Sequence, residues 1–102
     1  MNTYKRMMPI IIKAASEYTS LPVSVIMSKS RSRHICRVRF AVMWVARNRL
    51  ELTLNRIKDE LKLSDHSTVH NGLKRAEELR SSNVAFLNLI DYLIFSCLED
   101  AA

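Results

Sequence analysis

Two polar segments of this sequence, about thirty residues apart, carry the side chains with the clearest chemistry. The first is Ser30-Arg31-Ser32-Arg33-His34, and the second is Asp65-His66-Ser67-Thr68-Val69-His70-Asn71. The guanidinium groups of Arg31 and Arg33 suit phosphates or a narrow minor groove. The short donors and acceptors of the second segment suit base edges in a major groove. The pair therefore predicts a DNA reader in which one segment positions the protein and the other reads sequence.

The formal net charge of +6 is distributed unevenly along the chain. Residues 1–50 hold 10 Lys/Arg against Glu17 alone, a net +9, whereas residues 51–102 hold 6 against 9 acidic residues, a net −3. Seven basic residues and no acidic one lie from Lys29 to Arg49. This asymmetry points to nucleic acid or an anionic membrane surface as a partner, although a solvated basic face would also account for it.

The elements that must position these residues are predicted to be helices. One Gly, two Pro and the helical spacing of the apolar residues indicate a single all-α domain over residues 1–102, a compact bundle of about five to six helices. The expected helices cover about residues 4–18, 22–28, 35–50, 54–61, 65–80 and 84–99. Residues 29–34 are too polar to continue a helix and should form a loop.

Apolar spacing also predicts which faces of these helices are buried. The first helix should bury Met8, Ile11, Ala15 and Tyr18. The helix over residues 35–50 should bury Val38, Ala41, Val42, Val45 and Ala46. The expected N-caps of the last three helices are Thr53, Ser64 and Asn83.

A short helix, a turn and a polar-tipped helix follow one another over residues 54–80. The turn would consist of Lys62 and Leu63, which separate the two helices. The second helix should bury Val69, Leu73, Ala76 and Leu79 and expose Ser67, Asn71, Lys74 and Glu78. This arrangement predicts a helix-turn-helix motif.

The segments RSRHICRVRF and LKLSDHSTVHNGLKRAEEL resemble the two signatures of the C-terminal DNA-binding domain, domain IV, of the bacterial replication initiator DnaA. That family combines a basic loop containing an RSR-like run with a helix that opens with Asp-His-Thr-Thr-Val. The register between the two segments fits without a gap, and the resemblance covers about residues 10–98. It implies a stand-alone, sequence-preferring double-stranded DNA-binding protein that occupies DnaA-box-like sites and regulates replication initiation or transcription.

The resemblance also implies a role for individual residues. Arg31 resembles the minor-groove arginine of the basic loop, and Leu54 resembles an apolar contact at the start of the motif's first helix. Base readers in the major groove match Asp65, His66 and Ser67. Positions that hold phosphates match Thr68, Arg39 and Arg47. The complete set of expected DNA-binding residues is Arg31, Arg33, Arg39, Arg47, Leu54, Asn55, Asp65, His66, Ser67, Thr68, Asn71 and Lys74.

Some residues of this chain depart from the family's pattern. Asn55 stands where the family usually has proline, and Asn71 where it usually has histidine. Val38 replaces a proline and Phe40 a polar residue, and residues 62–64, Lys-Leu-Ser, replace a Gly-Gly-Arg turn. These departures bear on which DNA sequence is bound more than on the act of binding.

Several of these residues also have an ordinary structural explanation. Asp65 at the start of a helix stabilises the helix dipole by about 0.3–1 kcal/mol in any protein, so capping alone would account for it. His66 could be a surface histidine, and His70 fits a partly buried helix position better than a reading position. Arg31 and Arg33 could simply be solvated.

Enzyme and nucleotide-binding functions find little support in the sequence. Gly72 is the only glycine, so no phosphate-binding GxxxxGK[ST] loop exists, and we expect neither nucleotide nor cofactor. A metal nuclease built on Asp65, His66 and His70 would lack further carboxylate or histidine ligands. We therefore expect no catalytic and no metal-binding residues.

The most apolar stretch, Val84 to Leu98, is too short to span a membrane, which takes about 20 apolar residues. We expect a cytoplasmic, nucleoid-associated protein without a membrane partner. Apolar side chains surround almost the whole of this last helix. Either the first helix and the helix over residues 35–50 enclose it, or its outer side mediates a homodimer or, in a protein-interaction module, another contact.

Overall fold

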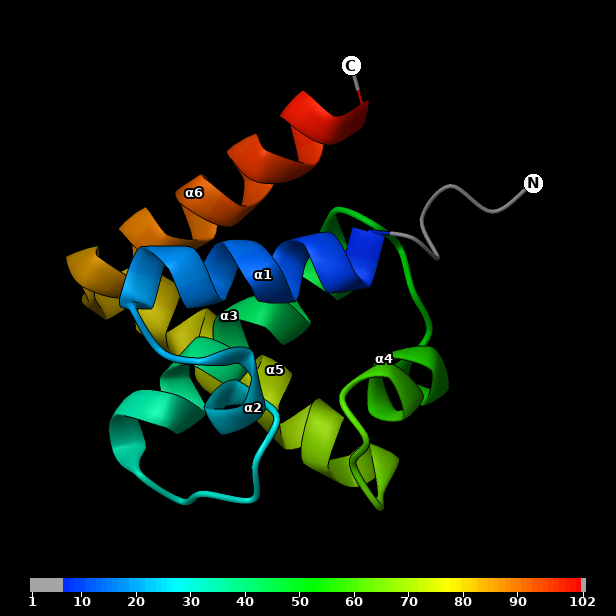
Figure 1. Cartoon of the computed structure of the whole chain (residues 1–102). Coiled ribbons are helices and arrows are strands. Elements are labelled where there is room, and N and C mark those ends of the chain that lie inside the picture. Colours follow the sequence, from blue (N-terminus) through cyan, green and yellow to red (C-terminus); the bar gives the residue numbers. More distant parts are fainter. Residues whose placement is uncertain (1–6, 102) are drawn as a thin grey trace.

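Six helices account for most of the chain in the computed structural model, which describes residues 7–101 and the side chains up to Leu98 (Figure 1). They are α1 Met7–Thr19, α2 Val23–Ile26, α3 Arg33–Asn48, α4 Leu54–Glu60, α5 His66–Ser82 and α6 Val84–Ala101. No strand forms within this described range. The predicted all-α class and the number of helices are confirmed.

The central helix α3 packs against α1, α5 and α6, and its predicted apolar face is buried. On this face, Val38, Ala41, Val42, Val45 and Ala46 are each at most 2% exposed. Figure 1 shows α1 and α6 on one side of α3, while the loop before α3 and the α4–α5 turn lie at the opposite end of the molecule. Packing of α2, α4 and α5 on α3 therefore joins these two connecting segments to the same core.

Two details of the first half differ from the sequence-based expectation. The third helix begins at Arg33 instead of residue 35, because Arg and His are tolerated in a first helical turn and the Cys36 N–H donates to the Ser32 carbonyl at 2.9 Å. Tyr18, expected in the core, is 46% exposed and stacks on Tyr92 with ring centroids 4.9 Å apart. The part of the first helix expected before Met7 lies outside the described residues.

The helix-turn-helix consists of α4 and α5, which pack through fully or almost fully buried Ile57, Leu61 and Val69. Thr53 caps α4 as predicted, since its hydroxyl accepts from the Arg56 N–H at 3.1 Å. The cap of α5 is Asp65, not Ser64, because the Asp65 carboxylate accepts from the N–H two residues further on.

The turn between α4 and α5 ends the first helix with a Schellman motif. The Lys62 N–H donates to the Asp59 carbonyl at 3.1 Å, and the Leu63 N–H donates to the Lys58 carbonyl at 2.9 Å. This geometry places Lys62 at φ 57°, the left-handed region that glycine occupies most readily. A side chain with a Cβ atom is therefore held at a strained position.

Replacing Lys62 with glycine should stabilise the fold by about 1 kcal/mol, because a non-glycine residue costs about 1–2 kcal/mol in this backbone region. Thermal or urea unfolding measures the change. Lys62→Ala is the matched control, since it removes the same charge without relieving the strain, and it should not stabilise. Equal stability of the two variants would contradict this account of the turn.

Close packing of α3 and α5 depends on the one glycine of the chain. Gly72 is buried, and a Cβ atom at its position would lie 2.4 Å from Met43 Sδ and 3.2 Å from a ring carbon of Phe40. Farther along the same two helices, the Trp44 indole N–H donates to a carboxylate oxygen of Glu77 at 2.6 Å. The guanidinium group of Arg80 lies 4.3 Å from the centre of the Trp44 ring.

The last helix, α6, is covered on one side and exposed on the other. Its inner side buries Phe86, Leu89, Ile90, Leu93 and Cys97 in a core to which α1 and α3 contribute. Its outer side leaves Val84, Leu87, Phe95 and Leu98 between 37% and 74% exposed. Among the described residues no helix taken alone is long and apolar enough to cross a membrane, and α5 with α6 passes that test only as a pair bent by 112°.

Candidate nucleic-acid interface

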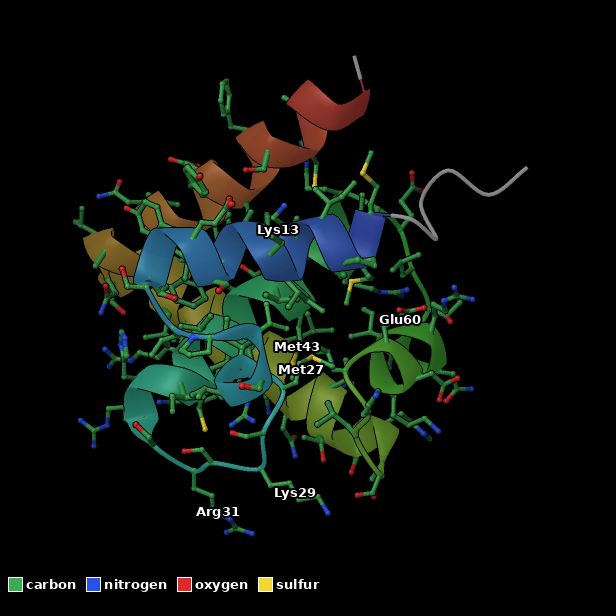
Figure 2. The ribbon with its side chains drawn as sticks, in the orientation of Figure 1. Lys13, Met27, Lys29, Arg31, Met43 and Glu60 are labelled. Atoms are coloured by element: carbon green, nitrogen blue, oxygen red, sulfur yellow. The ribbon has the colours of Figure 1, made fainter. Side chains whose placement is uncertain are left out.

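The basic loop, residues 28–32, alternates serines with cations. The serine hydroxyls serve the loop backbone: the Ser30 N–H donates to Ser28 Oγ and the Ser32 N–H donates to Ser30 Oγ, both at 3.2 Å. Lys29 and Arg31 are exposed, and Figure 2 shows both side chains extending from the loop away from the helices. The local hydrogen bonds therefore leave the cations for contact with solvent or a ligand.

Arg39, for which the family resemblance implies a phosphate contact, lies beneath this loop. It is 8% exposed and is the one charged residue buried in the described part of the chain. Its two terminal nitrogens donate to the carbonyl oxygens of Ser28 and Ser30, and Nη2 also lies 3.5 Å from Cys36 Sγ. A buried guanidinium needs such partners because an unpaired buried charge is strongly destabilising.

The start of α5 presents a second set of polar groups. Asp65, His66, Ser67 and Thr68 are all exposed. The Ser67 N–H donates to Asp65 Oδ1 at 2.8 Å, and this bond, with a smaller effect of the Ser67 hydroxyl, lowers the pKa of Asp65 below its ordinary value of 3.8. The carboxylate is therefore ionised at neutral pH. Its contribution to helix stability is complete above the unfolded-state pKa and is lost as pH falls through the lowered one.

A groove of about 720 Å³ joins the loop to α5. Its loop side is lined by Lys29, Ser30 and Arg31. Its α5 side is lined by Thr68, Asn71 and Arg75. Apolar side chains of the floor include Met27, Phe40 and Met43. No acidic residue lines the groove, so the structure joins the two predicted polar segments in one cationic surface.

The groove gathers only part of the predicted binding set, namely Arg31, Arg39, Thr68 and Asn71. The others lie outside it on the surrounding surface. Arg33, Arg47, Asn55 and Lys74 are exposed and Leu54 is partly buried. Nη1 of the Arg47 guanidinium donates to the Leu52 carbonyl at 2.9 Å, which anchors one terminal nitrogen near the start of the helix-turn-helix.

Three groove cations, Lys29, Lys62 and Arg75, were missed as individual site residues. Arg75 follows Asn71 by one helical turn, which could have indicated it, and it pairs with Glu78 at 2.8 Å. Lys62 enters the groove because the turn before α5 faces the basic loop. Sequence spacing alone does not show that these segments face each other.

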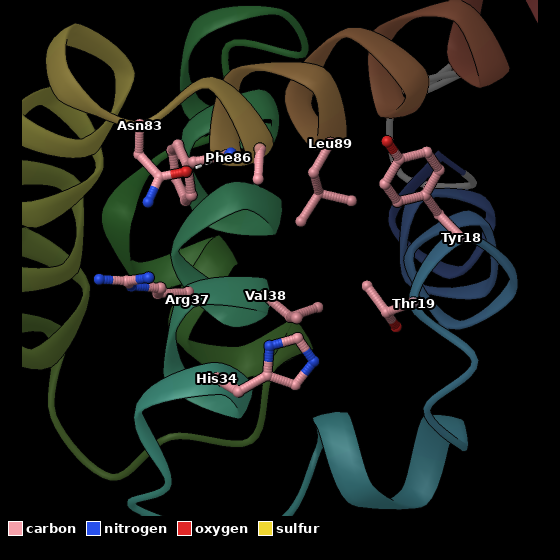
Figure 3. Close-up of a pocket in the computed structure, with 9 residues that line it drawn as sticks. Tyr18, Thr19, His34, Arg37, Val38, Asn83, Phe86 and Leu89 are labelled. Atoms are coloured by element: carbon pink, nitrogen blue, oxygen red, sulfur yellow. Dashed lines mark hydrogen bonds between the residues drawn. The ribbon is translucent and has the colours of Figure 1, made fainter.

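A second, smaller hollow of about 280 Å³ lies where the end of α1 and the starts of α3 and α6 meet (Figure 3). Its lining includes apolar Val38, Phe86 and Leu89. Figure 3 shows His34 directed toward the hollow and Arg37 extending away from it. The Phe86 N–H donates to Asn83 Oδ1 at 2.9 Å, so the predicted N-cap of α6 forms one edge.

Metal-ligating side chains do not cluster in the described part of the chain. Among the described residues, no group of three His, Cys, Asp or Glu side chains is arranged to hold a metal ion.

Fold and groove together define the class of protein, a small helix-turn-helix domain with a cationic groove. The family model described as bacterial dnaA protein helix-turn-helix matches residues 8–76, which is more than half of the chain. The chain belongs to this bacterial DnaA helix-turn-helix family. The resemblance stated from the two sequence segments is thereby confirmed, and the alternative of a protein-interaction module is not favoured.

Relatives named chromosomal replication initiator protein DnaA show the same similarity. The protein of Lachnoclostridium phytofermentans is 35% identical over 85 residues, which are 83% of this chain and 19% of the relative. The Helicobacter hepaticus protein is 33% identical over 79% of this chain and 18% of the relative. The Chromobacterium violaceum protein is 37% identical over 72% of this chain and 16% of the relative. The chain thus spans less than a fifth of these relatives, and no solved structure matches it significantly.

Proposed function

We propose that this chain binds double-stranded DNA with a sequence preference, with the start of α5 in the major groove and the basic loop in the minor groove. The observation that carries the proposal is the acid-free groove between Arg31 and the α5 residues Thr68 and Asn71. A DNA strand seated along this groove would meet cations from both sides. The major and minor grooves of the DNA on either side of that strand would then face the two polar segments of the protein.

Base reading is assigned to the exposed first turn of α5. Asp65 uses Oδ1 to cap the helix, which leaves Oδ2 to accept from a cytosine amino group. A carboxylate near DNA phosphates is electrostatically unfavourable, so its use there favours specificity over affinity. His66 and Ser67 offer donors and acceptors beside it, and Asn71 lies one turn further along.

Positioning is assigned to residues around the reading helix. Arg33, Arg47, Thr68 and Lys74 are exposed and would contact phosphates, while Arg31 enters the minor groove. At the start of α4 the proposed contacts are Leu54, with its methyl groups, and Asn55, with its amide. No step of this function requires catalysis, a nucleotide or a cofactor.

The relatives' name, chromosomal replication initiator, suggests the biological setting. We propose that the chain occupies DnaA-box-like sites and so competes with an initiator, or regulates transcription at such sites. This role would place it in the cytoplasm, associated with the nucleoid. Selection of bound duplexes from a random library tests the proposal directly, since the enriched sequences identify the site and a failure to enrich any sequence would refute sequence preference.

Substitution of Asp65 or His66 by alanine should reduce affinity for the selected site by about 1–3 kcal/mol and change affinity for scrambled DNA little. The physical reason is that base contacts are lost while phosphate contacts remain. Binding titrations with the selected and the scrambled duplex measure the ratio of the two affinities, which is the specificity ratio.

The matched control is Arg47→Ala, which should weaken binding to both duplexes alike because phosphates are the same in every sequence. Thermal unfolding separates reading from capping. If Asp65→Ala lowered the melting temperature and left the specificity ratio unchanged, Asp65 would be a helix cap without a reading role.

A homodimer through α6 is a second proposal, supported by a stripe of exposed side chains on its outer side. Val84, Leu87, Asp91, Phe95 and Leu98 follow the spacing i, i+3, i+7, i+11 and i+14 along one face. Asp91 stands at the centre of this stripe. Two-fold antiparallel pairing of two copies would bring the two Asp91 carboxylates together, so the dimer should be weak.

Sedimentation at micromolar concentrations should therefore show reversible self-association that Asp91→Asn strengthens and Phe95→Glu abolishes. The fold should survive Phe95→Glu, since Phe95 is 57% exposed. A wild-type chain that stays monomeric at all accessible concentrations, together with a monomeric Asp91→Asn variant, would refute the dimer.

A further inference from the structure

The backbone of the basic loop is held from two sides by side-chain hydrogen bonds. From within the loop, Ser28 Oγ and Ser30 Oγ accept the N–H groups of Ser30 and Ser32 at 3.2 Å. Ser28 Oγ also donates to the Val25 carbonyl at 2.6 Å, which ties the loop to α2. From beneath, the guanidinium group of Arg39 donates hydrogen bonds to the carbonyl oxygens of Ser28 and Ser30. Two backbone donors of the loop, the N–H groups of Ser30 and Ser32, and two acceptors, the carbonyls of Ser28 and Ser30, therefore have side-chain partners.

We propose that Arg39 is a positioning residue, which fixes the basic loop so that Arg31 is held ready for DNA, and that Arg39 does not itself bind a phosphate. This inference rests on the proposed DNA-binding function. An exposed phosphate ligand would have its nitrogens available, whereas both terminal nitrogens of Arg39 serve the loop and the side chain is 8% exposed. Holding a loop in its bound shape beforehand raises affinity because less conformational freedom is lost on binding.

The choice of arginine, and the place of Arg39 on α3, fit this role. A guanidinium is a planar fork whose two terminal nitrogens can serve two carbonyl oxygens at once, which the single nitrogen of lysine does less well. Arg39 is flanked on α3 by the core residue Val38 and lies one turn after Cys36, whose sulfur its Nη2 touches at 3.5 Å. The arginine therefore links the loop to the buried central helix α3.

The two roles of Arg39 predict different results for Arg39→Lys. A phosphate ligand would keep most of its electrostatic attraction on this change because the charge is kept, whereas a residue that spans two carbonyls would lose one of them. We expect Arg39→Lys to weaken binding to the selected duplex about tenfold, close to the effect of Arg31→Ala. The double variant Arg31→Ala/Arg39→Lys should bind within about twofold of Arg31→Ala alone, because Arg39 acts through Arg31.

The salt dependence gives an independent measure with Arg39→Met, which removes the charge and keeps an apolar stem. In the Arg31→Ala background, Arg39→Met should leave the slope of log K against log salt unchanged. If Arg39 bound a phosphate, the slope would fall in magnitude by about 0.9 and the two losses would multiply, which would overturn the proposal. If Arg39→Met does not fold, the double variant Arg31→Ala/Arg39→Lys, compared with Arg31→Ala, decides between the roles.

Amide hydrogen exchange of the DNA-free protein tests the positioning role without DNA. The Ser30 and Ser32 amides should be protected in the wild type and exchange at least tenfold faster in Arg39→Lys, while the core amide of Val42 should be unaffected. Unchanged exchange at Ser30 and Ser32 would refute the proposal. If the wild type bound no duplex, the proposed function would fail, and exchange would still show whether Arg39 holds the loop.

Discussion

The affinity of this chain for its preferred duplex should fall at least about a hundredfold between about 50 and 200 mM salt. Four exposed cations, Arg31, Arg33, Arg47 and Lys74, are available to DNA phosphates or to the negative potential of the minor groove. Each neutralised phosphate contributes about 0.9 to the slope of log K against log salt, so these four cations give a slope of about −3.6, and each of the groove cations Lys29, Lys62 and Arg75 that also meets a phosphate adds about 0.9 to its magnitude. Fluorescence anisotropy with a labelled duplex measures it.

Single variants test the electrostatic origin of this slope. Arg47→Ala should reduce its magnitude by about 0.9, because one phosphate contact is lost. Lys13→Ala is the matched control, since Lys13 is exposed on α1, which Figure 2 shows away from the basic loop, and the slope should not change. Binding that does not respond to salt, or no binding at low salt, would contradict the DNA-binding proposal.

Gly72→Leu should produce the largest loss of stability, about 2–3 kcal/mol, with a melting temperature lower by about 10 °C or more. The leucine Cβ would lie 2.4 Å from Met43 Sδ, and the rest of the side chain has no space between α3 and α5. The better helix propensity of leucine offsets only about 0.8 kcal/mol of this strain. Urea unfolding followed by circular dichroism measures the loss.

Ser81→Leu is the control for this prediction, because residue 81 is exposed on the same helix, and its stability should change by less than about 0.5 kcal/mol. The loss of stability in Gly72→Ala should lie between those of Gly72→Leu and Ser81→Leu, since the Met43 side chain can shift to admit one methyl group. If Gly72→Leu were as stable as the wild type, close α3–α5 packing would not be the reason for the glycine.

Apolar faces of the long helices could be predicted from the sequence because each face repeats with the helical period. Val38, Val42 and Val45 are buried as expected. Helix ends were less predictable, since they depend on single hydrogen bonds. Ser64 and Asp65 are both suitable caps, and the backbone conformation at Asp65 decides between them.

Residue types suggested the site, but tertiary contacts determine what each residue does in it. An arginine in a basic run gives no sign that it turns inward, so the burial of Arg39 could not be foreseen. Lys62 lines the groove because the α4–α5 turn faces the basic loop. These two segments are about thirty residues apart in the chain. The contact of Gly72 with Met43 also spans two helices.

The contact between Trp44, Glu77 and Arg80 gives the protein an intrinsic optical reporter. Trp44 is the single tryptophan, and its indole lies between a carboxylate acceptor and a guanidinium from the same helix that carries the proposed base readers. Indole emission responds to the charges and hydrogen bonds around the ring. Any tilt or separation of α5 from α3 would therefore change the emission spectrum, so a movement of the reading helix relative to α3 can be followed in the unlabelled wild-type chain as DNA is added.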